Sequence, residues 1–161
     1  MRIWYNFTKI WYNFKHGIIN LIIWFPVIWK NRDWDYCFLY KIMKKKLEMM
    51  ENLQRFHGHH VDDVAMANQM KACIVLIDRL IEDDYNSICF DDYFNKWGHP
   101  YYVEENHKFG MRKEKDIATE EDKIQKKKEF YDCINKEYEL KLNDKKELGR
   151  IIIDNIDSWW D

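Results

Sequence analysis

The stretch HVDDVAMANQMKACIVLIDRLIEDDY, residues 60–85, decides the fold of this 161-residue chain. Asp62 and Asp63 stand where a first helical turn favours carboxylates. Beyond them, apolar residues recur every three or four positions, as on one face of a helix: Met66, Met70, Cys73, Ile74, Ile77, Leu80, Ile81 and Tyr85. The spacing therefore predicts an amphipathic helix over residues 60–85.

A second helix is predicted just before it, over residues 33–57. Asp33 is a suitable N-cap, with Trp34 and Asp35 in the first turn, and Gly58 is a suitable stop. The apolar positions between them are Tyr36, Leu39, Met43, Leu47, Met50 and Leu53. Because the link is short, we expect the two helices to form an antiparallel hairpin.

The N-terminal segment, residues 1–30, is predicted to be an aromatic helix. Residues 3–7, IWYNF, recur without change at residues 10–14, and a shift of seven returns each side chain to nearly the same helix face. We expect this helix to pack on its own chain or on a second copy, with an interfacial membrane helix as the alternative. Pro26 should kink or end it.

The chain after residue 85 predicts further helix with one loop. Residues 88–97 either continue the second hairpin helix or form a short helix that ends before Gly98. We interpret residues 101–118 as a loop and residues 119–161 as C-terminal helices, opened by a capping-box-like Thr119 and interrupted at Gly149. The last segment carries an apolar stripe at Ile124, Tyr131, Ile134, Tyr138 and Leu142.

Composition supports a single all-α domain with the hairpin, residues 33–97, at its centre and the terminal helices packed around it. Gly and Pro together number only seven, which argues against a turn-rich β fold, and 47% hydrophobic residues argue against disorder. Four widely spaced cysteines, without a CxxC pair, suggest a reducing compartment. We find no leader peptide, and the nearly charge-free run 17–29 is short for a membrane span.

Charge is unevenly distributed along the chain. Residues 1–60 carry ten Lys or Arg and four Asp or Glu, residues 61–100 carry three and eight, and residues 101–161 carry thirteen and sixteen. This pattern indicates helices whose opposite charges complement one another. It does not favour binding to nucleic acid.

Several side chains of the hairpin and the C-terminus resemble a family of small helical proteins from tailed bacteriophages. The matching residues are Trp34, Asp35 and Tyr36, then Lys46, Leu47 and Met50, then 57–60 and 70–85, and finally Trp159, Trp160 and Asp161. The resemblance covers residues 25–97 and the last dozen. It implies a phage protein located in the cytoplasm of the infected bacterial host. The family carries no agreed activity, so the resemblance assigns no functional residue.

Three groups of residues are candidates for a site. Histidine with carboxylate at the hairpin tip is a weak metal candidate, at His59, His60 and Asp63. Glu48 and Glu51 form an ExxE pair of the kind used by Mg²⁺-dependent nucleotide pyrophosphatases, but the facing ExxD pair is missing, so we expect no such activity. Aromatic and cationic side chains that could bind a nucleotide are Trp34, Tyr36, Arg55, His57, His59, His60, Arg79, Tyr85, Trp159 and Trp160.

These residues favour a non-catalytic binding protein over an enzyme. We expect a homo-oligomer without a cofactor that sequesters a nucleotide signal of host immunity, with a host protein as the alternative partner. A metal-dependent nucleotide hydrolase and a structural or membrane-surface protein are further alternatives, although membrane contact is not the favoured one.

Overall fold

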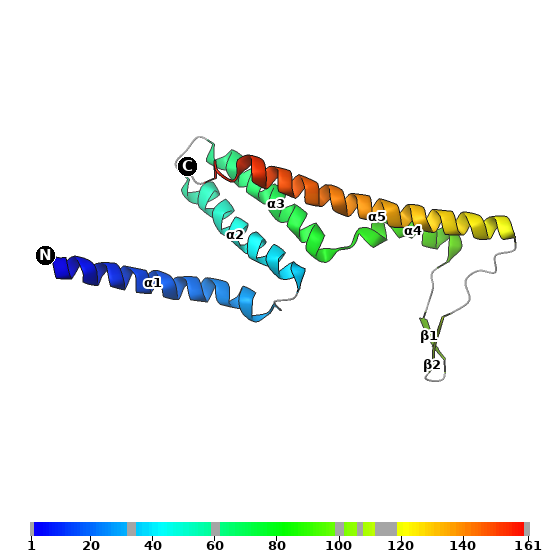
Figure 1. Cartoon of the computed structure of the whole chain (residues 1–161), viewed down its shortest axis with the longest axis horizontal. Coiled ribbons are helices and arrows are strands. Elements are labelled where there is room, and N and C mark those ends of the chain that lie inside the picture. The colour runs from blue at the N-terminus through cyan, green and yellow to red at the C-terminus, as the bar shows by residue number, and fades with distance from the viewer. Residues whose placement is uncertain are drawn as a thin grey trace. The chain divides into compact units, whose positions relative to one another are not determined.

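The chain is predominantly helical, as the sequence predicts (Figure 1). The computed structural model describes the backbone of residues 2–31, 35–58, 62–98, 102–105, 108–111 and 119–159, and side chains within 9–31, 35–58, 62–98 and 119–159. The described elements are α1 (Arg2–Trp29), α2 (Tyr36–His57), α3 (Asp63–Glu82), α4 (Tyr85–Trp97), β1 (Tyr102–Glu105), β2 (Lys108–Met111) and α5 (Glu120–Asn155). They fall into two compact units, Met1–Ile77 and Asp78–Asp161. The single domain expected from the length stays a prediction.

The first unit contains α1, α2 and most of α3. Asp35, not the predicted Asp33, caps α2: its carboxylate accepts a hydrogen bond from the Cys37 backbone N–H at 2.9 Å. Near the hairpin turn, Arg55 Nη2 of α2 donates to Asn68 Oδ1 of α3 at 3.1 Å. Helix α1 does not end at Pro26 but continues to Trp29.

The core of the hairpin follows the predicted spacing best in α3. Ala67, Met70, Cys73 and Ile77 are fully buried, and Leu47 and Met50 are the buried residues of α2. Of the six predicted apolar positions in α2, Tyr36, Leu39 and Leu53 are exposed. The periodicity therefore identifies helix α2 correctly but overestimates how many of its apolar side chains are buried.

The second unit begins at the end of α3 and is built on α4 and α5, which run along each other (Figure 1). Asp83, with φ 52°, ends α3, so Tyr85 opens a separate helix rather than extending the previous one. Cys89, Phe90 and Tyr93 of α4 form a buried cluster, and Cys133 and Leu140 of α5 pack against it. Desolvation by this burial raises the pKa of the Cys89 and Cys133 thiols.

Two predictions about the C-terminal half are wrong. The segment 101–118 is not entirely a loop, because β1 and β2 pair antiparallel, with Tyr102 opposite Met111. Helix α5 is continuous through Gly149 and includes most of the expected last segment. Its predicted start is confirmed, since the Thr119 hydroxyl accepts a hydrogen bond from the Asp122 backbone N–H at 3.2 Å.

Substitution of Gly149 by alanine should stabilise the protein. A Cβ added at Gly149 meets no atom within 4 Å, and glycine inside a helix costs about 0.5–1 kcal/mol relative to alanine. We expect Gly149→Ala to increase the free energy of unfolding in urea by about that amount. A decrease would show that the helix uses the flexibility of this position.

Candidate functional site

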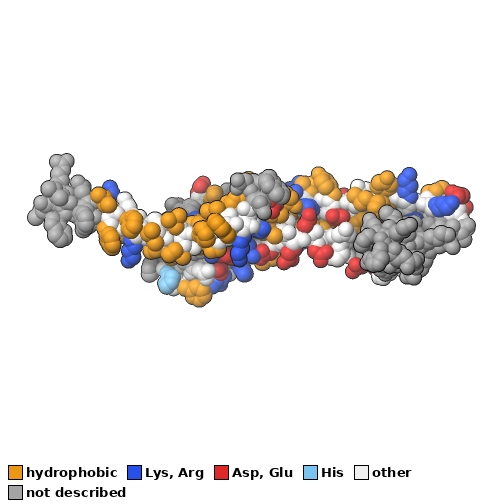
Figure 2. All heavy atoms as spheres, turned by 90° about the horizontal axis from the view of Figure 1, so that it is seen from below, with side chains coloured by type: hydrophobic (Ala, Val, Ile, Leu, Met, Phe, Trp, Pro, Cys, Tyr) orange, Lys and Arg blue, Asp and Glu red, His pale blue; other side chains and the backbone are white. Residues whose placement is uncertain are grey.

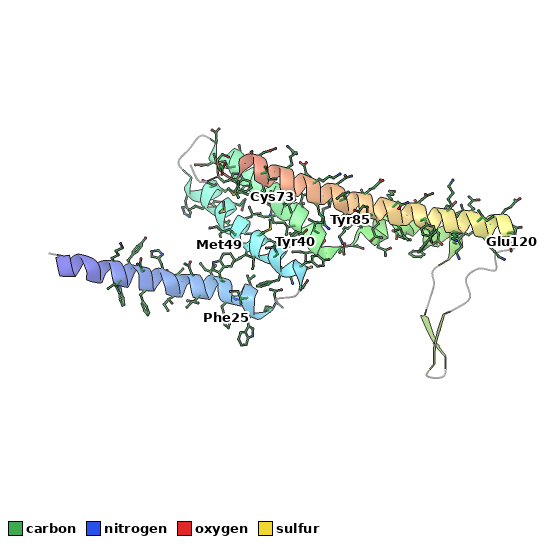
Figure 3. All side chains as sticks on the ribbon, in the orientation of Figure 1. Phe25, Tyr40, Met49, Cys73, Tyr85 and Glu120 are labelled. Carbon is green, nitrogen blue, oxygen red and sulfur yellow. The ribbon has the colours of Figure 1, made fainter. Side chains whose placement is uncertain are left out.

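A buried polar cluster that joins several helices surrounds Asp144 of α5. This residue is only 7% exposed, and its carboxylate contacts side chains from two other elements. The Tyr85 hydroxyl, at the start of α4, donates to Asp144 Oδ2 at 2.6 Å (Figure 3). Arg79 Nη2, in the last turn of α3, lies 2.9 Å from the same oxygen. One carboxylate thus joins three helices at the point where α3 gives way to α4.

A second ion pair holds the residue that breaks the helix. Lys141 Nζ, one turn before Asp144 on α5, lies 2.6 Å from Asp83 Oδ1 and 2.7 Å from Oδ2. A left-handed conformation is unfavourable for residues other than glycine, although aspartate tolerates it better than most. The two contacts from Lys141 compensate for that cost and fix the break against α5.

Tyr85 is held in its protonated form. Desolvation by burial and the hydrogen bond to Asp144 both raise the pKa of this phenol well above its ordinary range. Its proton is committed to Asp144, and Arg79 is committed to the same carboxylate. We therefore interpret this group, Arg79, Tyr85 and Asp144, as a structural lock rather than as an acid–base pair.

A small cleft of about 180 Å³ lies beside this lock. Arg79 is the single cation among its lining residues, and two carboxylates oppose it: the lining is Arg79, Glu82, Asp84, Tyr85, Ser87 and Ile88. Pockets that enclose small organic ligands usually measure about 300–1,000 Å³. Both the size and the acidic lining argue against this cleft as a site for a nucleotide phosphate.

Among the predicted nucleotide-binding residues that the structure describes, Arg79 and Tyr85 meet at a common partner, Asp144. Tyr36 is exposed at the first position of α2, whereas Arg55 and His57 lie at the opposite end of that helix. Trp159 is buried, at 3% exposure. Trp34, His59, His60 and Trp160 lie outside the described residues.

Where the structure describes them, the carboxylates considered for a pyrophosphatase or metal site lie against other residues of the chain. Glu51 binds Arg55 Nε at 2.5 Å, and Glu48 lies 3.9 Å from Lys44 Nζ. Asp63 is buried next to Gly58. Within the described residues, no three His, Cys, Asp or Glu side chains gather closely enough to hold a metal ion.

Sequence reasoning missed a second polar cluster, around Glu129 of α5. Its carboxylate accepts hydrogen bonds from Lys96 Nζ at 2.5 Å, Trp97 Nε1 at 2.6 Å and Gln125 Nε2 at 2.8 Å. These donors, with Lys96 foremost, lower the pKa of Glu129 from its ordinary 4.5 to about 2. Lys96 and Trp97 come from the end of α4, so the cluster ties that end to α5. A single Glu among the many of this helix gave no signal in the sequence.

The Glu129 cluster should give stability a defined pH dependence. Because the folded-state pKa lies below the ordinary value, the stabilisation is complete above about pH 4.5 and is lost as the pH falls toward about 2. We expect Glu129→Gln to lower the melting temperature at neutral pH, and the difference from the native chain to shrink across that interval. A difference that stays constant down to pH 2 would contradict the assignment.

Among the described residues, the helix with the most exposed large apolar side chains is α1. Side chains spaced three or four apart form what we call the apolar face of α1: Ile10, Trp11, Phe14, Ile18, Leu21, Ile22, Phe25, Ile28 and Trp29. All are exposed, Trp29 most of all at 76%, and hydrophobic side chains crowd the side of α1 seen in Figure 2. The Phe25 and Trp29 rings stack along this face, with centroids 5.1 Å apart.

The opposite side of α1 carries the polar residues. Lys9, Asn13, His16 and Asn20 follow one another at spacings of four, three and four, and we call them the polar stripe of α1. In the next turns the same side bears Ile23, Trp24 and Val27, the half-buried side chains among those described in α1. Since α1 contacts α2, this side faces the chain and the apolar face points away, as the Phe25 side chain shows (Figure 3).

Helix α1 does not meet the requirements of a membrane span, and neither does any other helix among the residues that the structure describes. Comparisons with protein-family models, with curated protein sequences and with solved structures found no match for this chain. The resemblance to a phage family therefore stays an expectation based on the residues alone.

Proposed function

We propose that this protein is a non-catalytic interaction protein whose binding element is the apolar face of α1. The observation that supports this proposal is the exposure of nine large apolar side chains along one side of a single helix. Contiguous apolar patches beyond a few hundred Å² are rare on monomers and mark surfaces that bind something. Helix α1 would then attach the rest of the chain to its partner.

The buried polar groups favour a structural role for the rest of the chain. Arg79, Tyr85 and Asp144 satisfy one another, and Glu51 and Asn68 engage Arg55. The nucleotide-sequestering function expected from the sequence needs Arg55 and Arg79 to be available for phosphates, so the geometry supports it less well. It stays a prediction, which calorimetry with a panel of cyclic nucleotides and ADP-ribose derivatives tests.

A matched pair of variants tests the proposed function. Phe14→Asp with Leu21→Asp places two charges on the apolar face of α1, whereas Asn13→Asp with Asn20→Asp places the same charges on the polar stripe. In lipid-free buffer, we expect the native chain and the polar-stripe variant to assemble into a homodimer or larger oligomer, because no described side chain covers this face. The apolar-face variant should be a single chain.

Light scattering at micromolar concentration gives the mass of the particle that each variant forms. Retention on a hydrophobic resin measures how much apolar surface each variant exposes. An unchanged melting transition would confirm that the rest of the chain stays folded in both variants. The proposal fails if the apolar-face variant matches the native chain in both mass and retention.

A further inference from the structure

We infer that the apolar face of α1 binds the surface of a membrane that contains anionic lipids; this inference rests on the proposed function and names its partner. Helix α1 carries Arg2, Lys9 and Lys15 and no carboxylate, and the first carboxylate of the chain is Asp33. A cationic amphipathic helix with a broad apolar face lies in the plane of the lipid headgroups, where anionic lipids attract its charges.

The width of the apolar face of α1 favours lipid over a second copy of the helix. In a helical projection, Ile10 and Ile28 mark one edge and Ile22 the other, roughly 120° away at 100° per residue. A two-stranded coiled coil uses a narrower seam of two positions per heptad. Pairing through this face would also bring Lys15, near its edge, toward another cationic helix without a carboxylate to balance it, because α1 contains none.

The aromatic content of the apolar face fits the same partner. Trp11, Phe14, Phe25 and Trp29 belong to it, and they are exposed by more than half. Tryptophan is enriched at the boundary between hydrocarbon and water, because its ring is apolar and its N–H remains hydrated. Lys15 lies near the edge of the face, where a long side chain can keep its ammonium group among the headgroups.

The contact of α1 with α2 leaves this face accessible. Ile23, Trp24 and Val27 lie on the opposite side, and Lys41 Nζ of α2 donates to Asn31 Oδ1 at 2.7 Å just after α1 ends. The helix can therefore lie on a flat surface through its apolar face without losing its contact with α2.

Sedimentation of the full-length chain with lipid vesicles tests the inference. We expect binding to vesicles of phosphatidylcholine mixed with phosphatidylglycerol, weaker binding to phosphatidylcholine alone, and weaker binding to the mixture in high salt. Phe14→Asp with Leu21→Asp should lower the affinity at least about tenfold more than Asn13→Asp with Asn20→Asp, because only the first pair removes apolar surface from the contact. The two variants have the same net charge, so the comparison isolates the apolar face.

Lys9→Gln with Lys15→Gln tests the electrostatic part. We expect this variant to lose most of its preference for phosphatidylglycerol while its binding to phosphatidylcholine changes little. Equal loss of binding in the apolar-face and polar-stripe variants would overturn the inference, because it would mean that charge alone holds the chain on the vesicle.

The failure of this inference is distinguishable from the failure of the proposed function. If the native chain ignores both kinds of vesicle but forms an oligomer that the apolar-face variant loses, the face is covered by a second copy and the lipid inference is wrong. If vesicle binding, mass and resin retention are all independent of the face, both proposals are wrong.

Discussion

Asp144→Ala should cost about 2–3 kcal/mol of unfolding free energy, one of the two largest losses we expect. The substitution removes the acceptor for both Tyr85 and Arg79, and the Tyr85 hydroxyl stays buried without that acceptor. Leaving a buried polar group unsatisfied costs about 1–3 kcal/mol. The side chain of Arg79 is 49% exposed, so water compensates for much of its lost ion pair. Urea unfolding followed by far-ultraviolet circular dichroism measures the change.

Tyr85→Phe is the control for Asp144→Ala. It removes only one hydroxyl and leaves Asp144 with Arg79, so we expect a smaller loss of about 1–2 kcal/mol. Because burial raises the pKa of Tyr85, this hydroxyl stabilises the native chain fully below its ordinary pKa of 10.0 and progressively less as the pH rises above that value. The difference between native chain and Tyr85→Phe should therefore decline in alkali. If Arg79→Gln costs as much as Asp144→Ala, the ion pair rather than the phenol dominates the lock.

Gly58→Ala should destabilise the hairpin by about 1–3 kcal/mol, the usual range for overpacking a tight site. A Cβ at Gly58 would overlap the Asp63 carboxylate and would lie 2.5 Å from the Gln54 carbonyl oxygen. Asp63 is only 4% exposed, so its side chain has little room to move aside. Urea unfolding measures the loss, and Gly17→Ala, where an added Cβ meets no atom within 4 Å, is the control.

A second substitution separates the two obstacles at Gly58. In the Gly58→Ala background, Asp63→Ala should recover part of the lost stability, because it removes the carboxylate and leaves only the Gln54 carbonyl in the way. Strictly additive losses would show that Asp63 does not obstruct the new methyl group.

The sequence correctly predicts that Gly58 follows α2, but the conformational reason for a glycine there is wrong. Glycine often follows a helix because it adopts positive φ, but here φ is −66° and the requirement is close approach of Asp63 and the preceding turn. Such an approach involves the start of the next helix, and periodicity within one helix contains no information about it. The same limit applies to the N-cap of α2, which the sequence predicts at Asp33 and the structure places at Asp35.

Helix α5 shows why the buried face is harder to predict than the helix itself. Its apolar stripe at Ile124, Tyr131 and Tyr138 is exposed, and the side facing α4 carries Cys133 and Leu140. That side also holds Glu129, Lys141 and Asp144, whose partners come from α4 or from the end of α3. Polar residues that pair across helices look like solvent-facing residues in a sequence, so the paired face was hidden among the charges.

The candidate site was likewise only partly predictable from the sequence. Arg79 and Tyr85 were identified from their chemistry, but their common partner Asp144 lies 59 residues from Tyr85 in the chain and no local pattern links them. The exposure of α1, in contrast, could be expected from the sequence. This helix has more apolar side chains than its contact with α2 can cover.

The limited contact between α1 and α2 has a consequence for how the protein exchanges its amide hydrogens. An isolated helix of this length is marginally stable in water, and tertiary packing usually supplies most of the protection. The amides of residues 9–20, whose side chains are all exposed, should exchange with deuterium much faster than those around the buried Met70 and Ile77. A partner that covers the apolar face would slow exchange in α1 while leaving the core unchanged, so the helicity of this segment would itself report whether the protein is bound.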